Sequence, residues 1–220
     1  MKNETVERYY KNLKKKYLSL LTKRCFDFIA ALVMLVVLSP VLLVLSLLIK
    51  IDSKGPVFYR QTRVTAGNRD FRIFKFRTMV VDADKIGTLV TVDRDPRITN
   101  IGNKIRKYRL DELPQLLNII KGEMSFVGTR PEVRKYVDSY SDEMIATLLL
   151  PAGVTSLASI KYKDEDEIIA SHTQNGESID ETYIQYVLPQ KMQYNIEYLK
   201  TFSFWGDIKL MLNTVISVVK

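Results

Sequence analysis

The chain has 220 residues, enough for one domain with its own core, and a net charge of +8. The charge is uneven: residues 1–80 hold 16 Lys and Arg against 5 Asp and Glu, whereas residues 81–220 hold 17 against 20. Cys25 is the single cysteine, which excludes an internal disulfide and fits a reducing compartment. A basic first third suits an anionic membrane surface, and nucleic acid is not expected as a partner because it gives no reason for the apolar run that follows.

Residues 1–24 are expected to form a basic amphipathic helix. Its apolar side chains fall on one stripe, with lysines elsewhere: Val6, Tyr10, Leu13, Tyr17 and Leu20. A helix of this kind suits the surface of a bilayer. The alternative is a lead-in helix that packs on the domain.

Residues 25–52 contain the run Phe28–Ile49, 22 residues without a charge, of which 16 are Leu, Ile, Val or Phe. As one helix the run would be ~33 Å long, enough to cross a bilayer. Ser39 and Pro40 lie at its middle, however, where proline kinks or breaks a helix. Both flanks are basic, and positive residues stay on the cytoplasmic side. This favours a monotopic, re-entrant helix-break-helix over a single span, a buried helix or an uncleaved signal.

Residues 53–220 are expected to form one compact cytoplasmic domain of the α+β class. Val57–Val64 and Asp70–Met79 have the composition of two strands, joined as a small β-hairpin through residues 66–68. Because side chains alternate along a strand, Lys75 and Arg77 share one face and could hold a diphosphate. Solvated strand charges would explain the same pattern equally well.

A short acidic and basic cluster follows the hairpin. Asp93 and Asp95 have a spacing that can bind a hard cation, but a local turn before Pro96 is favoured. The C-terminal stretch Phe202–Val219 is amphipathic and carries polar residues. It is expected to lie on the domain or at an interface, as a surface helix.

The stretch Leu110–Gly122 has the pattern of a helix with an acidic start. Asp111 is placed as its N-cap and Gly122 as its stop. A capping role alone would account for Asp111. The functional interpretation depends on the surroundings, since a helix start also favours phosphate oxygens and Arg106, Arg109 and Arg130 are near in sequence. Adjacent helical residues diverge by ~100°, so Asp111 and Glu112 are expected not to point at one atom.

Several separated motifs, in one order from about Lys23 to the end, carry a family resemblance. They are Lys23-Arg24 with Phe26-Asp27, Ser39-Pro40, Gly55-Pro56-Val57-Phe58, Lys75-Phe76-Arg77-Thr78-Met79, Asp95-Pro96-Arg97, Asp111-Glu112-Leu113-Pro114-Gln115-Leu116, and Val127-Gly128 with Arg130-Pro131. On these residues the chain resembles the bacterial sugar transferases, monotopic enzymes that load a phosphosugar onto polyprenyl phosphate. The Asp-Glu-Leu-Pro-Gln-Leu string is the most specific of them.

The resemblance implies a phosphoglycosyl transferase of the bacterial inner membrane, working at its cytoplasmic face. Asp111 would be the covalent nucleophile that attacks a UDP-sugar and releases UMP, with Glu112 as the partner carboxylate, either a general base or a group near the metal. The aspartyl phosphosugar would pass to undecaprenyl phosphate. Mg²⁺ bridging Asp111 and the diphosphate is expected, and Lys75, Arg106 and Arg130 match positions that line the phosphate site.

The chain also departs from the family pattern. Thr129 replaces a proline of Val-Gly-Pro-Arg-Pro, and Pro151–Ser156 has an extra residue and lacks a glycine. Both departures are expected to lie near the nucleotide or sugar. The sequence leaves open which UDP-sugar is used, which glycoconjugate pathway is served and whether two copies form a homodimer.

Two functions from other classes remain as alternatives. One is a membrane-anchored, non-catalytic binding protein for anionic lipid or nucleic acid, in which Asp111→Asn would leave function intact. The other is a different membrane phosphoryl enzyme, such as a lipid pyrophosphatase, which would turn over without a nucleotide sugar.

Overall fold

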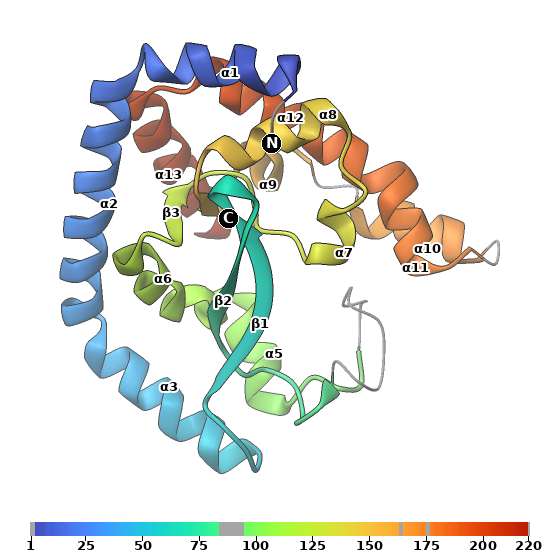
Figure 1. Cartoon of the computed structure of the whole chain (residues 1–220). Coiled ribbons are helices and arrows are strands. Elements are labelled where there is room, and N and C mark those ends of the chain that lie inside the picture. Colours follow the sequence, from blue (N-terminus) through green and yellow to red (C-terminus); the bar gives the residue numbers. More distant parts are fainter. Residues whose placement is uncertain (1–2, 84–94, 163–164, 175–176, 220) are drawn as a thin grey trace.

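Helices surround two small β-sheets in this chain (Figure 1). The computed structural model describes residues 3–219 apart from 84–94, 163–164 and 175–176. The helices are α1 Glu4–Lys14, α2 Tyr17–Val37, α3 Ser39–Asp52, α5 Asn100–Lys107, α6 Leu116–Lys121, α7 Arg134–Val137, α8 Asp142–Ile145, α9 Leu157–Lys161, α10 Glu165–Gln174, α11 Ile179–Thr182, α12 Leu188–Thr201 and α13 Phe204–Val219. The strands are β1 Phe58–Thr65, β2 Arg69–Phe76, β3 Met124–Val127 and β4 Ala152–Thr155; short 3-10 or π turns are η1 Ala66–Asn68, η2 Leu110–Gln115, η3 Ala146–Leu149 and η4 Tyr183–Val187. This mixture confirms the predicted α+β class.

The first helix is shorter than predicted. α1 ends at Lys14, and residues 17–24 belong to α2, so the prediction of one helix over residues 1–24 is wrong. The apolar side chains of α1 join the main core cluster through Val6, Tyr9 and Leu13. The helix therefore packs on the domain, which was the alternative. At the corner between the helices, the Lys16 Nζ donates to the Phe202 carbonyl at 2.6 Å and holds the turn.

The apolar run forms two helices with a sharp bend between them. α2 ends at Val37, and α3 begins at Ser39 with Pro40 in its first turn, where a missing N–H costs nothing. The Ser39 hydroxyl donates to the Val36 carbonyl at 2.8 Å. The two axes differ in direction by 62°, so the predicted break at Ser39-Pro40 is confirmed. Among the described residues no single helix is long and apolar enough to cross a bilayer, and only this bent pair satisfies that test together.

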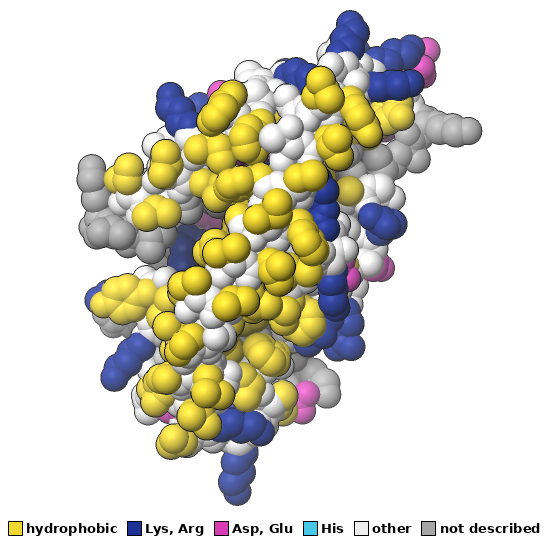
Figure 2. All heavy atoms as spheres, turned by 90° about the vertical axis from the view of Figure 1, so that its left-hand side faces the viewer, with side chains coloured by type: hydrophobic (Ala, Val, Ile, Leu, Met, Phe, Trp, Pro, Cys, Tyr) yellow, Lys and Arg dark blue, Asp and Glu magenta, His cyan; other side chains and the backbone are white. Residues whose placement is uncertain are grey.

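The outer surface of the bent pair is apolar. Figure 1 shows α2 and α3 as an arc around one side of the molecule, and Figure 2 shows the hydrophobic side chains gathered along that side. Its exposed large apolar side chains include Leu21, Phe28, Ile29, Leu32, Val33, Val36 and Val37 of α2 and Val41, Leu43, Val44, Leu47 and Ile51 of α3. A contiguous apolar surface of this extent indicates contact with a membrane or a partner.

The inner surface of α2 carries a buried ion cluster instead. The Lys23 Nζ donates to the Asp207 Oδ2 at 2.5 Å and to the Val127 carbonyl at 2.9 Å, and it lies 4.0 Å from the Asp27 Oδ2. Tyr198 donates its hydroxyl to the Asp207 Oδ1 at 2.9 Å. A buried charge needs partners of this kind to offset its desolvation. The cluster therefore joins α2 to α13, α12 and β3.

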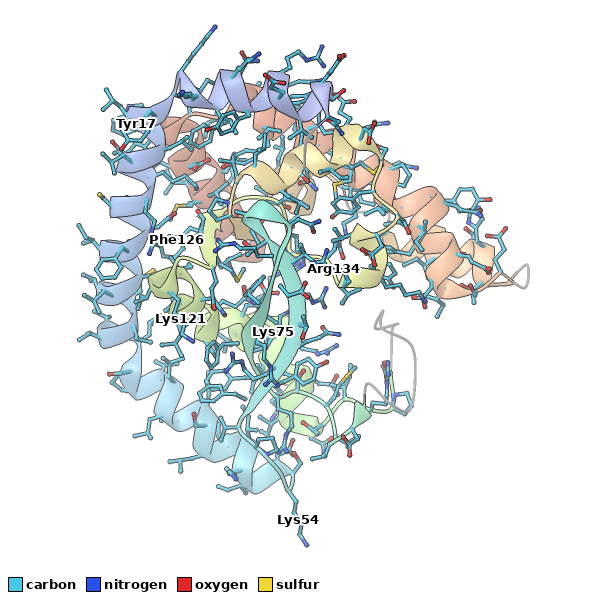
Figure 3. All side chains as sticks on the ribbon, viewed as in Figure 1. Tyr17, Lys54, Lys75, Lys121, Phe126 and Arg134 are labelled. Atoms are coloured by element: carbon cyan, nitrogen blue, oxygen red, sulfur yellow. The ribbon has the colours of Figure 1, made fainter. Side chains whose placement is uncertain are left out.

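The predicted β-hairpin is confirmed. β1 and β2 pair antiparallel, with Tyr59 opposite Lys75, and η1 makes the turn with Gly67 at a φ of 72°. β2 ends at Phe76 rather than at Met79. The Arg77 N–H still donates to the Val57 carbonyl at 2.9 Å, so the pairing continues one residue further. Figure 3 shows Lys75 on this hairpin and Lys54 beyond the end of α3, pointing away from the body.

The two segments that depart from the family pattern lie side by side in the second sheet. β3 and β4 are parallel. Past the end of β3, the Gly128 N–H donates to the Thr155 carbonyl at 3.1 Å, and the Thr129 carbonyl accepts from the Gly153 N–H at 2.9 Å. A Cβ on Gly128 would lie 2.4 Å from the Pro151 carbonyl oxygen, so only glycine fits this approach. The sheet thereby fixes the start of the segment that carries Arg130.

Candidate active site

Asp111 and Glu112 lie in the short 3-10 turn η2, which begins at Leu110, and not in the α-helix predicted over residues 110–122. Pro114 lies inside this turn and cannot donate the i→i−4 bond that an α-helix would need there, so the α-helix α6 starts only at Leu116. Arg109 holds the N-cap position with a left-handed φ of 52°, and no side chain caps the turn. The N-cap role predicted for Asp111 is therefore wrong.

One lysine lies between the two carboxylates. The Lys75 Nζ is 3.2 Å from the Glu112 Oε1 and 3.9 Å from the Asp111 Oδ2. The prediction that the two carboxylates cannot point at one atom is therefore wrong. The two side chains leave the backbone in different directions, but both carboxylates reach the Lys75 ammonium because it lies between them and the glutamate side chain is longer by one methylene group.

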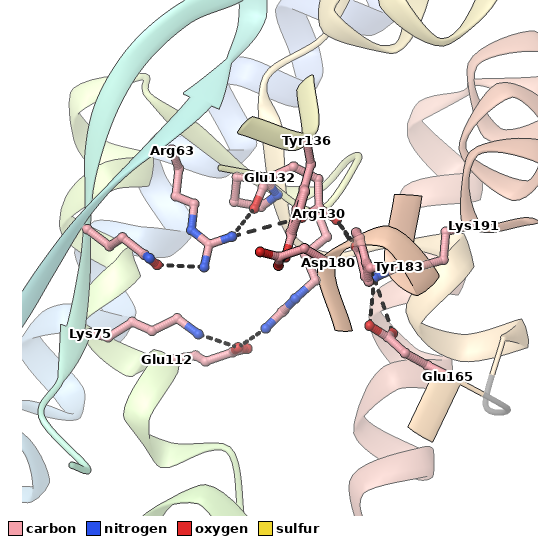
Figure 4. A network of polar contacts seen from close by, with 12 residues as sticks. Arg63, Lys75, Glu112, Arg130, Glu132, Tyr136, Glu165, Asp180, Tyr183 and Lys191 are labelled. Atoms are coloured by element: carbon pink, nitrogen blue, oxygen red, sulfur yellow. Dashed lines mark hydrogen bonds and ion pairs between the residues drawn. The ribbon is translucent and has the colours of Figure 1, made fainter. Parts of the chain in front are cut away.

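Arg130 holds Glu112 from the other side (Figure 4). Its Nη2 donates to the Glu112 Oε1 at 2.7 Å. Burial acts to raise the pKa of Glu112, but Arg130 and Lys75 outweigh it and bring that pKa well below its usual range. In return the Glu112 carboxylate raises the pKa of Arg130. Glu112 is thus a fixed anion that orients two cations.

Asp111 behaves in the opposite way. Its side chain is 13% exposed, and burial raises its pKa, with Lys75 opposing the shift and the Glu112 charge adding to it. Among the described residues no other side chain donates a hydrogen bond to the Asp111 carboxylate, and its 3.9 Å contact with the Lys75 Nζ is long. Asp111 is thus the less firmly held carboxylate of the pair.

Both carboxylates face a cavity of about 690 Å³. Of its described lining residues nine are Lys or Arg and three are Asp or Glu: Arg60, Arg63, Arg72, Lys75, Arg77, Arg97, Arg106, Arg109, Arg130, Asp82, Asp111 and Glu112. A surplus of positive charge in an open cavity favours a polyanion such as a diphosphate. Phe58, Tyr59 and Phe76 also line the cavity and offer surfaces for an aromatic group.

The other predicted phosphate-site residues also reach this cavity. Arg106 lines it from α5, and its Nε donates to the Thr78 Oγ1 at 2.8 Å. Arg77 lines it too, but its guanidinium donates to the Ser53 and Lys54 carbonyls at 2.7 and 2.8 Å. These bonds tie the end of α3 to the hairpin, so Arg77 has a structural task beside any contact with a ligand.

Two further arginines line this cavity: Arg63, to which the sequence pattern assigned no role, and Arg109, which was predicted only to lie among the cations near Asp111. Arg63 donates to the Pro131 carbonyl at 3.2 Å and to the Gln61 Oε1 at 2.6 Å, which positions the segment after Arg130 (Figure 4). Its position two residues before Asp111 indicated that Arg109 lies near the site, but no residue pattern predicts the left-handed backbone at this position. Glu132, bonded to the Tyr183 hydroxyl at 2.6 Å, extends the network toward η4.

Only one of the two departures from the family pattern lies near this cavity. Thr129 is adjacent to Arg130, whereas none of residues 151–156 lines the cavity. Val154 and Thr155 line a second cavity on another side of η2. That both departures lie near the nucleotide or sugar therefore stays a prediction.

The carboxylates suit one kind of metal site. No group of three metal-binding side chains occurs in the described part of the chain, and Asp93 lies outside it. Asp95 of the same pair is bound to Arg97 at 2.6 Å. Magnesium is commonly held by one or two carboxylates and the phosphates of a substrate, however, and Asp111 offers such a carboxylate. The residues present fit an ion that arrives with a diphosphate.

These features define an α+β protein with a cationic cavity that holds two adjacent carboxylates, and with an apolar outer face. Comparison with known proteins agrees: the chain belongs to the bacterial sugar transferase family, whose model matches residues 18–220.

Curated relatives support the same placement. The chain is 36% identical to a UDP-N-acetylgalactosamine-undecaprenyl-phosphate N-acetylgalactosaminephosphotransferase of Aeromonas hydrophila, over 90% of this chain and 43% of that protein. It is 35% identical to a UDP-glucose:undecaprenyl-phosphate glucose-1-phosphate transferase of Caulobacter vibrioides, over 90% of this chain and 70% of the relative. A protein of the same name from Escherichia coli is 33% identical over 89% of this chain and 39% of its own length. The chain thus spans less than half of the Aeromonas and Escherichia relatives.

Proposed function

We propose that this protein transfers a sugar 1-phosphate from a UDP-sugar to undecaprenyl phosphate, as a polyprenyl-phosphate hexose-1-phosphate transferase in glycoconjugate assembly. The observation that carries the proposal is the pair at positions 111 and 112. One carboxylate is fixed by Lys75 and Arg130, and the other is buried, loosely held and faces the same cationic cavity. The names of the relatives supply the donor and acceptor classes.

In the first half-reaction an Asp111 oxygen attacks the β-phosphorus of the UDP-sugar. The bond between that phosphorus and the bridging oxygen breaks, and UMP leaves with the electron pair, so an aspartyl phosphosugar remains. Lys75, Arg106 and Arg130 neutralise the charge that grows on the departing phosphate. Glu112 holds Lys75 and Arg130 in place for this task.

In the second half-reaction a phosphate oxygen of undecaprenyl phosphate attacks the same phosphorus. The acyl phosphate bond to Asp111 breaks, which restores the carboxylate and yields a lipid diphosphosugar. Two covalent steps allow a soluble donor and a lipid acceptor to use one nucleophile in turn.

Mg²⁺ belongs to this proposal as the expected cofactor. Asp111 would hold it together with the diphosphate, and the ion would supply further neutralisation of the transferred phosphoryl group. Asp111 must be ionised both to hold the ion and to attack. Its raised pKa means that activity is lost on acidification at a higher pH than for an ordinary aspartate.

The membrane topology is proposed from the bent helix pair. α2 and α3 would enter the cytoplasmic leaflet of the bacterial inner membrane with the bend at Leu38 deepest, and both basic flanks would return to the cytoplasm. The apolar outer face would then lie in lipid, and the cationic cavity would lie at the depth of the lipid headgroups.

Release of UMP tests the function. Purified protein in detergent with undecaprenyl phosphate, Mg²⁺ and a panel of UDP-sugars should release UMP with at least one donor, and Asp111→Asn should not. A non-catalytic lipid-binding protein would give no UMP with any donor. A lipid pyrophosphatase would turn over lipid diphosphate without a nucleotide sugar. Either outcome would contradict the proposal.

A further inference from the structure

A second cavity of about 710 Å³ lies on another side of η2. Its apolar lining comes from the bend of α2, from η2 and α6, from the second sheet and from the last helices: Met34, Leu113, Leu116, Phe126, Val154, Ile160 and Val215. Met34 and Val215 are 38% and 63% exposed, so the cavity opens on the apolar outer surface near the bend. It is therefore continuous with the face that the proposed topology places in lipid.

The serine and threonine hydroxyl groups of this cavity are already bonded within the protein. Thr155 and Thr214 share a hydrogen bond of 2.8 Å, and the Ser159 hydroxyl bonds that of Ser156 at 2.7 Å. The Ser217 hydroxyl donates to the Thr214 carbonyl of its own helix at 2.8 Å. What these side chains offer a guest is mainly their methyl and methylene surface. The cavity therefore suits a hydrocarbon chain.

The cavity is lined by two carboxylates, Glu112 and Glu165, which pair with Arg130 and Lys191, and by two cations at one end. Lys107 and Arg109 line it and are exposed, and Tyr108 between them is 58% exposed. Within the described part of the chain neither cation forms an ion pair, and the Lys107 Nζ lies only over the Tyr108 ring, at 5.8 Å. Two cations beside an exposed tyrosine match a phosphate at the boundary between water and lipid.

This cationic end is also where the two cavities meet. Arg109 and Glu112 line both, whereas Asp111 lines only the first. The left-handed φ of 52° at Arg109 is uncommon for a residue with a side chain, and such conformations are retained at functional sites. A phosphate held by Arg109 from the second cavity would be two residues from the nucleophile.

From these observations we infer that the second cavity binds the acceptor lipid, an isoprenoid phosphomonoester, with the first isoprene units between Met34 and Val215 and the phosphate at Lys107 and Arg109. The inference rests on the proposed function and adds a separate route for each substrate. The nucleotide sugar enters the first cavity from the aqueous side. The lipid phosphate reaches the aspartyl phosphosugar through the second, along the Arg109 side of η2.

Filling the second cavity tests this inference, with the UMP burst in the absence of acceptor as the measure of the first half-reaction. Val215→Trp and Met34→Trp should lower kcat/KM for undecaprenyl phosphate about tenfold or more by occupying space that the lipid needs. Both variants should keep the burst, because neither residue lines the donor cavity. Lys107→Gln should raise KM for the acceptor and leave the burst.

Neighbouring residues provide matched controls. Ile216→Trp and Val33→Trp place the same indole on exposed apolar positions, 54% and 55% exposed, that do not line the cavity. Lys104→Gln removes an exposed charge of α5 that lies outside it. These three variants should match the wild-type protein in both half-reactions. If the cavity variants also match it, or if the controls lose acceptor use equally, the inference is overturned.

A binding readout separates the inference from the proposed function. Undecaprenyl phosphate with a photoreactive group on its first isoprene unit should label peptides of α2 or α13, and unlabelled undecaprenyl phosphate should compete while phosphatidylglycerol should not. Labelling confined to the hairpin side, or equal competition by phosphatidylglycerol, would overturn the inference even if UMP is released. Absence of any burst with every UDP-sugar would instead contradict the proposed function.

Discussion

At the scale of single residues, the fold drives two neighbouring carboxylates in opposite directions. Glu112 lies between Lys75 and Arg130, at 3.2 and 2.7 Å, and its pKa is well below the usual range. Asp111 is buried with weaker compensation, and its pKa is raised. One carboxylate stabilises the folded protein, and the other costs stability. Sites that perform chemistry commonly show this second pattern.

Replacement of Asp111 by asparagine should therefore stabilise the protein. The folded state holds the Asp111 proton more tightly than the unfolded state does, so ionisation costs stability at all pH values above the raised pKa. At pH 7.5 the Asp111→Asn variant should be more stable by about 1 kcal/mol, an increase of about 2–4 °C in Tm. The gain should vanish below the unfolded pKa of 3.8, where the carboxyl is protonated in both states. Thermal unfolding in detergent at several pH values measures this.

The matched change Glu112→Gln should have the opposite sign. Its depressed pKa contributes stability above the unfolded value of 4.5, and that contribution is lost as the pH falls through the folded value. Removing the charge leaves Lys75 and Arg130 buried without their partner, which costs about 3 kcal/mol near neutral pH. If both variants shift Tm in the same direction at pH 7.5, the assignment of the two environments is wrong.

The sequence indicated Asp111 and Glu112 as site residues, but it did not predict their backbone conformation or the cation that lies between them. The spacing of the Asp-Glu pair and the nearby cations marked the site, yet the predicted helix geometry set the carboxylates apart. A proline inside the segment converts it to a 3-10 turn, and a lysine from a strand 36 positions earlier lies between them. Contacts across such a distance in sequence depend on the packing of the hairpin against η2, which local patterns do not encode.

At the scale of elements, the helix pair α2–α3 shows how local signals can suffice. A proline within an apolar run was enough to predict the break, and the structure has a bend of 62° at that position. α1 shows the opposite case. Its lysine-rich pattern suggested a bilayer surface, but Val6, Tyr9 and Leu13 are buried in the core. An apolar stripe predicts that a helix packs against an apolar surface, but whether that surface is the protein core or a bilayer depends on the rest of the fold.

The re-entrant topology predicts that both ends of the pair face the cytoplasm. In a Cys25→Ser background, cysteines placed at Lys15 and at Lys54 should react with an impermeant maleimide in inside-out vesicles and not in intact spheroplasts. A cysteine at Ser39 should be protected in both. Reaction of the two flanks from opposite sides of the membrane would show a single span.

Straightening the pair provides the control for this labelling. The double change Ser39→Ala and Pro40→Ala restores a backbone donor and a better helix former at the break. It should move the label at position 54 to the opposite side in a fraction of molecules. The label at position 15 should stay cytoplasmic because the basic flank before α2 is unchanged.

At the scale of the whole molecule, one buried cluster connects α2 and α13 to the core. Lys23 of α2 bonds Asp207 of α13 and the end of β3. These contacts fix α13 relative to α2, and so they set the distance between Met34 and Val215, which line the second cavity from these two helices. Both cavities meet η2, so the placement of α13 affects the site from the lipid side.

Lys23→Met should therefore destabilise the protein strongly. The change leaves Asp207 and Asp27 buried without a cation and should cost about 3 kcal/mol or more. Lys14→Met is the matched control, because Lys14 is exposed and should change stability by about 0.5 kcal/mol or less. Denaturant unfolding in detergent measures both, and equal stability of the two variants would contradict a structural role for the cluster.

The central claim is that Asp111 carries the phosphosugar between donor and acceptor. The most direct measurement is the mass of the protein after exposure to a UDP-sugar and Mg²⁺ without acceptor, followed by an acid quench and peptide mapping. The account predicts added mass of one sugar phosphate on the peptide that contains Asp111, lost on addition of undecaprenyl phosphate and absent from Asp111→Asn. UMP release with no added mass at position 111 under any quench, or an adduct that persists in Asp111→Asn, would contradict it.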